Sequence, residues 1–287
     1  MALENKIDFA VIFSVKNANP NGDPLNGNRP RTDYDGYGEV SDVCIKRKIR
    51  DRLQEMGLSI FVQSDDRRKD DYRSLKARGE GVLGKAFGSD QMAARACELW
   101  FDVRAFGQIF AYKATKKAKS KKGEDKAGET EDESAISIPI RGPVSVHSAI
   151  SIEPVSITSM QITKSVSGEG DGSKRGSDTM GMKHRVDKLA VYVFFGAMNP
   201  QLAERTGFSD DDAEQIRAVL PRLFENDASS ARPDGTMRVL KAFWWKHNCK
   251  AGQYSSAKVH GSLKVEPDGT YQLSNLEGLL PGVIDGF

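Results

Sequence analysis

A largely apolar run near the amino terminus, followed by a long turn-rich loop and a basic helix, constrains the fold more than any other feature. Residues 7–15 read Ile-Asp-Phe-Ala-Val-Ile-Phe-Ser-Val, which predicts a strand buried on at least one face. The loop at residues 17–38 contains Asn-Pro, Asn-Gly, Asp-Pro and Asp-Gly pairs, which favour turns. Loops of this length are usually functional or disordered, so we expect a functional site beside the strand.

The helix that follows the loop combines an apolar stripe with a basic side. Ser41 can cap its start. Its inward stripe consists of Ile45, Ile49, Leu53 and Met56. Lys46 and Arg50 lie one turn apart on another face, with Arg47 and Lys48 beside them. A capped helix start offers free backbone N–H groups and a positive dipole end, which suit a phosphate. Two cations further along would hold the next part of a polyanion, so we predict a nucleic-acid site.

Strand-like and helical patterns alternate along the rest of the chain. Strands are predicted at residues 58–63, 103–112, 136–162, 189–197 and 236–246, and helices at 89–100 and 209–224. The long elements follow the order strand–helix–strand–strand–helix–strand, with inserts after the first helix and the third strand. This order predicts an α+β chain with a ferredoxin-like fold, similar to that of RNA-recognition motifs. Many unrelated proteins share the pattern, so it does not decide the function.

Composition indicates a globular chain without disulfides. The 287 residues are 38% hydrophobic and 29% charged, with a net charge of +2 and a pI near 8.3, so any basic surface must be local. Cys44, Cys97 and Cys249 are scattered and odd in number, which argues against a disulfide framework or zinc site and fits a reducing cytoplasm. No signal peptide and no membrane-spanning run is visible, so we expect a cytoplasmic protein.

Two stretches are predicted to project from the body. Residues 113–135 carry lysines first and then mainly acidic residues, with almost no apolar side chains, which predicts a mobile charged loop. The loop could be merely solvated, or its lysines could contact nucleic acid. Residues 160–186 have strand-like flanks around a glycine-rich tip, which predicts a β-hairpin. Met180 and Met182 alternate on its returning strand and are expected to share a face, as core or as an apolar wedge.

Several short functional motifs are excluded because key residues depart from the motif. Residues 79–86 nearly match a phosphate-binding P-loop, but Ala86 lacks the hydroxyl that would hold magnesium. Residues 104–110 depart from the RNA-stacking strand of RNA-recognition motifs at Ala105 and Gln108. The histidines are isolated and show no metal-binding spacing. We therefore expect no catalytic residue, no metal ligand and no cofactor.

The opening stretch also carries a family resemblance. Residues 9–24 read Phe-Ala-Val-Ile-Phe-Ser-Val-Lys-Asn-Ala-Asn-Pro-Asn-Gly-Asp-Pro, and later echoes are Phe-Asp-Val-Arg-Ala-Phe-Gly at 101–107, Arg-Gly-Pro-Val-Ser at 141–145 and Thr-Met-Gly-Met-Lys-His-Arg at 179–185. Together they resemble the CRISPR-associated backbone subunit of the type I-C Cascade complex, within the RAMP superfamily. The resemblance implies a ferredoxin-like palm, a fingers-like insertion at residues 57–99 and a thumb hairpin at 160–186.

The resemblance further implies partners and a binding site. Copies of the chain would stack head to tail along a guide RNA (crRNA), together with other Cascade subunits, and present the spacer to the target DNA strand. The helix start and its cations would hold guide phosphates, helped by the opening loop, while the methionines would press into the guide–target duplex. The candidate RNA-binding residues are Asn19, Asn21, Arg29, Arg31, Ser41, Lys46, Arg47, Arg50, Lys164, Met180 and Met182.

Two other functions compete with a non-catalytic backbone. Backbone subunits of other CRISPR types cut RNA with a loop aspartate, so Asp23, Asp33 and Asp35 could support a metal-dependent endoribonuclease. Against that, Asp23 precedes a proline and Asp35 a glycine, as in ordinary turns, and the type I-C subunits that this chain resembles are not nucleases. The other alternative is an unrelated ferredoxin-like protein that binds a small anion at the Ser41 helix.

Overall fold

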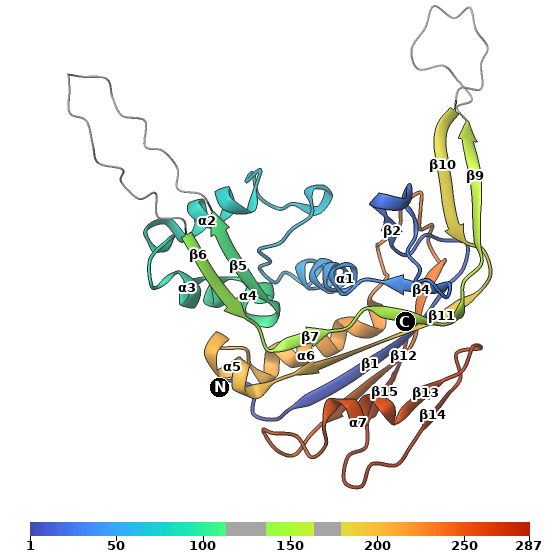
Figure 1. Ribbon diagram of the computed structural model, residues 1–287. Coiled ribbons are helices and arrows are strands. Elements are labelled where there is room, and N and C mark those ends of the chain that lie inside the picture. The colour runs from blue at the N-terminus through green and yellow to red at the C-terminus, as the bar shows by residue number, and fades with distance from the viewer. Residues whose placement is uncertain (113–135, 164–178) are drawn as a thin grey trace, which may run out of the picture.

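The computed structural model describes residues 1–112, 136–163 and 179–287, and its centre is an antiparallel sheet (Figure 1). The strands follow the order β15-β12-β1-β11-β8-β4, and β7 also pairs with β11. They are β1 (Ile7–Val15), β4 (Tyr37–Val40), β7 (Val144–Val146), β8 (Ala149–Pro154), β11 (Ala190–Met198), β12 (Met237–Lys246) and β15 (Gly282–Asp285). All nine residues of β1 are buried; β11 and β12 pair with it along its whole length, and a core packs on each of its faces. The predicted strands at 7–15, 189–197 and 236–246 are therefore confirmed.

Helices cover one face of this sheet. Alternate residues of β1, beginning with Phe9 and Val11, point into a core shared with two helices. These helices are α1 (Asp42–Glu55) and α6 (Asp210–Val219), preceded by the short α5 (Pro200–Thr206). Ile45, Ile49 and Leu53 of α1 are buried as predicted, whereas Met56 is 49% exposed and lies outside the stripe. The helix ends one residue earlier, so position 56 no longer follows the buried face.

The carboxyl-terminal segment covers the other face of the sheet. The intervening residues of β1, Ala10 and Ile12, pack there against Val259, Leu263 and neighbours. This segment contains α7 (Ser256–Gly261), β13 (Leu263–Val265) and β14 (Tyr271–Leu273), which lie below the sheet in Figure 1. The sheet is therefore enclosed on both sides, which explains why β1 reads as an almost continuous apolar run.

The chain between α1 and β7 packs around a core of its own, at the upper left of Figure 1. Its elements are α2 (Leu75–Leu83), α3 (Met92–Leu99), α4 (Phe101–Phe106), β5 (Gly107–Tyr112) and β6 (Ile136–Arg141). The core is built from Phe61, Trp100 and Phe110 with their neighbours. We call residues 57–112 together with β6 the insertion. The predicted charged loop at 113–135 lies outside the described residues.

Three predicted elements of the insertion differ in the structure. Residues 58–63 form no strand, because the amides of Phe61 and Val62 bind the Asp102 carboxylate instead of a neighbouring strand. The predicted strand at 103–112 begins only at Gly107, after helix α4. Gly107 has φ +80°, and a Cβ there would lie 2.3 Å from the Ile140 carbonyl oxygen, so glycine is needed where helix turns into strand. The helix predicted at 89–100 is α3, which begins at Met92 without a side-chain cap.

A two-stranded hairpin rises at the opposite end of the molecule from the insertion (Figure 1). Its strands are β9 (Ile157–Thr163) and β10 (Thr179–Val186), paired antiparallel. Between the hairpin and the insertion lie α1 and the opening loop, with β2 (Gly22–Asp23) and β3 (Arg29–Pro30). No helix in the described part of the chain is long and apolar enough to span a bilayer.

Candidate nucleic-acid interface

The start of α1 is capped by Ser41 and tied to the opening loop. Ser41 Oγ accepts a hydrogen bond from the Cys44 amide at 3.3 Å. Asn21 Oδ1 accepts from both the Ser41 amide and the Ser41 hydroxyl, each at 2.9 Å. Two predicted site residues, Asn21 and Ser41, are therefore brought together. Asp42 adds a negative charge to the first turn and binds Lys46 Nζ at 2.9 Å, so a phosphate at this end would have to compete for Lys46.

The two cations predicted one turn apart on α1, Lys46 and Arg50, differ in exposure. Lys46 is partly exposed, but Arg50 is buried. Its Nε donates to Asp102 Oδ2 at 2.9 Å, and its guanidinium lies over the Phe106 ring at 5.1 Å. The reason is tertiary, because the insertion packs α4 against this side of α1. Helical spacing alone could not show that this side is covered.

A cavity of about 260 Å³ lies on another side of α1, between the opening loop, the short helical turn η2 (Asp65–Arg67) and the loop at 227–232. It brings basic and acidic side chains from four segments together. The cations are Arg47, Lys48, Arg67 and Arg232, and the acids are Asp51, Asp66 and Asp227. Four positive and three negative groups leave one excess positive charge. We call this the α1 pocket.

Ion pairs organise the cations of the α1 pocket. Arg47 contacts Asp51 at 3.0 Å and Asp66 at 3.3 Å, and Arg67 approaches Asp51 at 3.9 Å. Lys48, which is buried, and Arg232 both bind Asp227. The Arg47 side chain is 41% exposed, so it can bind a phosphate while keeping its contacts with the aspartates. Burial raises the pKa of the Asp51 carboxyl, because the charged form loses hydration there.

The opening loop places its predicted residues differently. Asn19 is buried and donates from Nδ2 to the Asn28 carbonyl at 2.7 Å, so it shapes the loop. Within the described residues its Oδ1 accepts no hydrogen bond. Arg29 is exposed on β3, and Arg31 lies 3.7 Å from Asp23. Arg29 is therefore free of burial at the loop edge, whereas Arg31 is half-buried and paired with Asp23.

Two of the three loop aspartates accept backbone hydrogen bonds in turns, as expected for Asp23 but with Asp33 in place of Asp35. Asp23 accepts from the Leu25 amide at 3.2 Å and caps a short 3-10 turn, η1 (Pro24–Asn26). Asp33 accepts from the amides of Asp35 and Tyr37 at 3.0 and 2.8 Å. Over the ranges that the structure describes, no group of three or more His, Cys, Asp or Glu side chains is placed to hold a metal ion.

The hairpin carries apolar and basic side chains and contains a shift in strand register. The β9–β10 register shifts between Thr179 and Gly181, so Met180 has no paired residue on β9, and the predicted common face of Met180 and Met182 stays a prediction. Met182 is 56% exposed. Exposed Met160 lies opposite Lys183, which joins apolar and basic character on one face. Lys164 lies outside the described residues.

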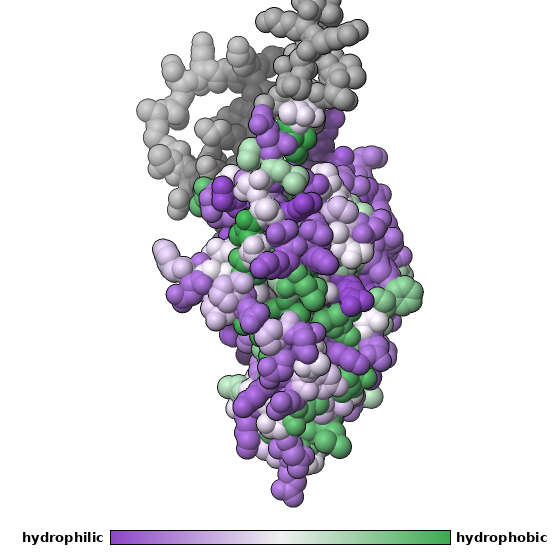
Figure 2. All heavy atoms as spheres, turned by 90° about the vertical axis from the view of Figure 1, so that its right-hand side faces the viewer, coloured by the Kyte–Doolittle hydropathy of each residue, from purple (hydrophilic) through white to green (hydrophobic). Residues whose placement is uncertain are grey.

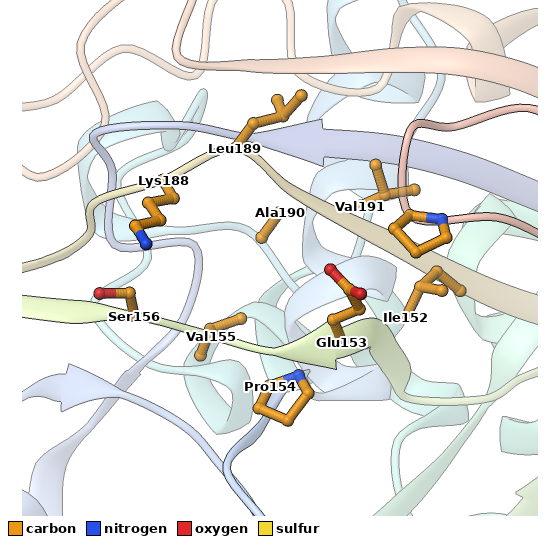
Figure 3. Close-up of a pocket in the computed structure, with 10 residues that line it drawn as sticks. Ile152, Glu153, Pro154, Val155, Ser156, Lys188, Leu189, Ala190 and Val191 are labelled. Carbon is orange, nitrogen blue, oxygen red and sulfur yellow. The ribbon is translucent and has the colours of Figure 1, made fainter.

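A second pocket lies at the root of the hairpin, between residues 152–156 and 188–191 (Figure 3). Its volume is about 230 Å³, and the Glu153 carboxylate points across it toward the second segment. Leu189 at its edge is 55% exposed. In Figure 2, which faces this side, apolar side chains gather in a band below the hairpin.

Comparison with known proteins identifies the family of the chain. The family model described as CRISPR-associated protein Cas7 matches residues 5–277. The chain belongs to the Cas7 family. The CRISPR-associated protein Cas7 of Haloferax volcanii is 26% identical over 293 residues, which span 99% of this chain and 82% of the relative. This confirms the CRISPR-associated backbone family that the sequence resemblance indicated, while the type I-C subtype stays a prediction.

Two solved structures also match this Cas7-family chain. One is titled "CRISPR RNA-guided surveillance complex, pre-nicking", with 15% identity, a TM-score of 0.43, and coverage of 84% of this chain and 75% of the other. The second, titled "CRISPR RNA-guided surveillance complex", has 15% identity, a TM-score of 0.41, and coverage of 84% and 68%.

Three cations of the α1 pocket were missing from the predicted site. Lys48 was noticed only as a neighbour of Arg47, while Arg67 and Arg232 come from segments far away in the sequence. The Ser64-Asp65-Asp66-Arg67 stretch has the signal of a short capped turn, but charge alone marked it only as solvent-facing. The α1 pocket is thus assembled from four separated segments, of which the sequence pointed to two.

Proposed function

We propose that this chain is a non-catalytic backbone subunit of a type I-C surveillance complex, in which several copies stack head to tail along a guide RNA. The observation that carries the proposal is the α1 pocket, an array of cations with one excess positive charge on a Cas7-family chain. The turn-forming roles of Asp23 and Asp33 support a subunit that does not cut RNA. Other Cascade subunits and a target DNA strand complete the proposed partners.

The proposed palm is a ferredoxin-like unit. The strand order β12-β1-β11-β8, with α1 and α6 on one face, supports it. Residues 57–99 would then be fingers and the hairpin at 160–186 a thumb. The fingers and thumb lie on either side of α1 in Figure 1, which suits a strand of RNA laid across the helix.

Guide contacts in this proposal are mainly electrostatic. Arg47 and Arg67 would bind phosphates over the α1 pocket, with Lys46 and the Ser41–Asn21 corner beside them. Arg29 and Arg31 would extend the contact along the opening loop. Contacts to phosphate set register without reading bases, and pairing with the guide supplies specificity. Exposed Met182 and the bulged Met180 would act later, on the guide–target duplex.

The test is to mix purified protein with labelled guide RNA, with and without magnesium. We expect bound, full-length RNA in both conditions, and less than about a tenfold difference between unrelated spacers of equal length, equivalent to about 1.4 kcal/mol. Magnesium-dependent cutting would establish the endoribonuclease instead. Failure to bind RNA while binding inorganic phosphate would favour the small-anion protein.

A further inference from the structure

Helix α4 lies between the two largest cores on the α1 side of the sheet. Phe101 packs in the core between sheet and helices, while Val103, two residues on, packs in the core of the insertion. Between them, Asp102 is 1% exposed. A carboxylate this deeply buried is stable only with several hydrogen-bond or ionic partners.

The Asp102 carboxylate joins three segments of the chain. Its Oδ1 accepts from the Phe61 amide at 2.7 Å. Its Oδ2 accepts from the Val62 amide at 3.0 Å and from Arg50 Nε at 2.9 Å. Asp102 therefore ties α1, α4 and the entry into the insertion to one point.

Further buried contacts extend this junction in both directions. Arg78, 3% exposed, donates to the Phe61 carbonyl at 2.7 Å and also binds Asp70. On the other side, Arg104 forms two hydrogen bonds with Asp212, which belongs to the capping box of α6. The insertion is thus linked to both helices of the sheet through charged side chains with defined directions.

The junction bears on the α1 pocket because the pocket is shared. Arg47 and Asp51 come from α1, whereas Asp66 and Arg67 come from the insertion. The distance between Arg47 and Arg67 therefore depends on how the insertion sits against α1. A shift of about 1 Å is enough to spoil a set of contacts that must act together.

We propose that Arg50 and Asp102 are positioning residues that hold the insertion against α1 and so set the geometry of the α1 pocket. The link to guide RNA rests on the proposed function, but the positioning role does not. Arg50 then supports guide binding through Asp102 and contacts no phosphate, in contrast to what its place in the sequence predicts. The Arg50 side chain is only 11% exposed, which agrees with this role.

Hydrogen exchange of the RNA-free protein tests the positioning role. Asp102→Asn keeps the shape of the side chain but removes its charge and one acceptor. We expect faster exchange at Phe61, Val62 and α4, by at least about tenfold, with unchanged protection in β1 and β11. Arg50→Lys keeps the charge and should restore part of the protection that Arg50→Ala removes. Wild-type exchange in both Asp102→Asn and Arg50→Ala would overturn the proposal.

Guide affinity gives a second test, in which the direction of the change in affinity distinguishes a positioning role from a simple charge effect. Removing a negative charge should strengthen binding of a polyanion if charge alone matters. We expect Asp102→Asn to weaken guide binding by about fivefold or more, with an unchanged salt dependence, because the pocket loses its geometry. Tighter binding by Asp102→Asn would overturn the link to the pocket.

If wild-type protein binds no guide RNA, the proposed function fails, while hydrogen exchange still decides the positioning role. If Arg50→Ala does not fold, Asp102→Asn and Arg50→Lys carry both readouts.

Discussion

Arg47 and Arg50 lie within one turn of α1 but face different parts of the protein. The Arg47 side chain is 41% exposed at the α1 pocket and pairs with Asp66, which is 74% exposed. The Arg50 side chain is 11% exposed and pairs with Asp102, which is 1% exposed. The same residue type therefore serves two purposes on one helix. What separates them is coverage by the insertion, which is a property of the tertiary structure.

The difference also changes the expected energetics. An exposed ion pair contributes about 0–1 kcal/mol, because water and salt already solvate its charges. A buried pair contributes little beyond its desolvation cost when intact, but removing one partner leaves an uncompensated charge. Arg47 can therefore bind RNA at little cost in stability, whereas Arg50 is needed for the folded structure.

The largest expected effect is on stability. Arg50→Ala should lower the free energy of unfolding by about 3–5 kcal/mol, because Asp102 is left charged and buried. Arg47→Ala on the same helix should lower it by less, because Arg47 is 41% exposed and its buried partner Asp51 still has Arg67 at 3.9 Å. Urea unfolding of the RNA-free protein measures both. Equal losses for the two variants would remove the distinction between the two sides of α1.

The next effect is on guide binding. The double variant Arg47→Ala with Arg67→Ala should flatten the slope of log affinity against log salt by about 0.7 for each lost phosphate contact. Arg95→Ala is the matched control, because Arg95 is an exposed arginine of α3 outside the pocket. Titrations at several salt concentrations measure the slope. A slope that stays at the wild-type value would take both arginines out of the interface.

A smaller effect should follow from Asp51→Asn. Loss of one negative charge from the α1 pocket should raise guide affinity about threefold at pH 7, equivalent to about 0.6 kcal/mol, because it removes repulsion of the phosphates. Because burial raises the pKa of Asp51, wild-type affinity should rise as the pH falls toward that pKa, since protonation removes the repulsion. The variant should lose this part of the pH dependence. Fluorescence anisotropy between about pH 5 and 8 measures it, and weaker binding by the variant would contradict the account.

The smallest effect on stability is expected at the hairpin. Met182 is 56% exposed, so Met182→Ser should lower the free energy of unfolding by well under the ~1.5–3 kcal/mol of a fully buried side chain. In the assembled complex, Met180→Ser with Met182→Ser should keep guide binding and weaken target engagement. Thermal melting of the free subunit, followed by target affinity of the complex, tests both parts. A large drop in melting temperature with normal target affinity would indicate that these methionines belong to the core.

Much of the sheet and its helices followed from sequence periodicity. The apolar run of β1, the Ser41 cap and the stripe of Ile45 and Ile49 all rest on local rules that the structure obeys. The turn at Asp23 also followed from local chemistry, whereas the side chain that accepts the amides of the second turn is Asp33 and not the expected Asp35. In each case the residues that determine the conformation are neighbours in the chain.

The rest depended on contacts that sequence order does not reveal. Phe101, Val103 and Ala105 alternate as in a strand, yet they lie on a six-residue helix whose side chains reach two different cores. Arg232 joins the α1 pocket from the far end of the chain. The burial of Arg50 could be predicted only by knowing that Asp102 contacts it in the folded protein. Charge spacing on α1 could therefore suggest an RNA site but not choose the side of the helix.

Cross-linking tests the central claim most directly. Guide RNA containing 4-thiouridine would be bound to the wild-type protein, irradiated, and the attached peptides identified. We predict cross-links to the opening loop, the exposed side of α1, η2 and residues 227–232, which surround the α1 pocket. Cross-links confined to the carboxyl-terminal segment around α7 and β13, on the opposite face of the sheet, would contradict the account.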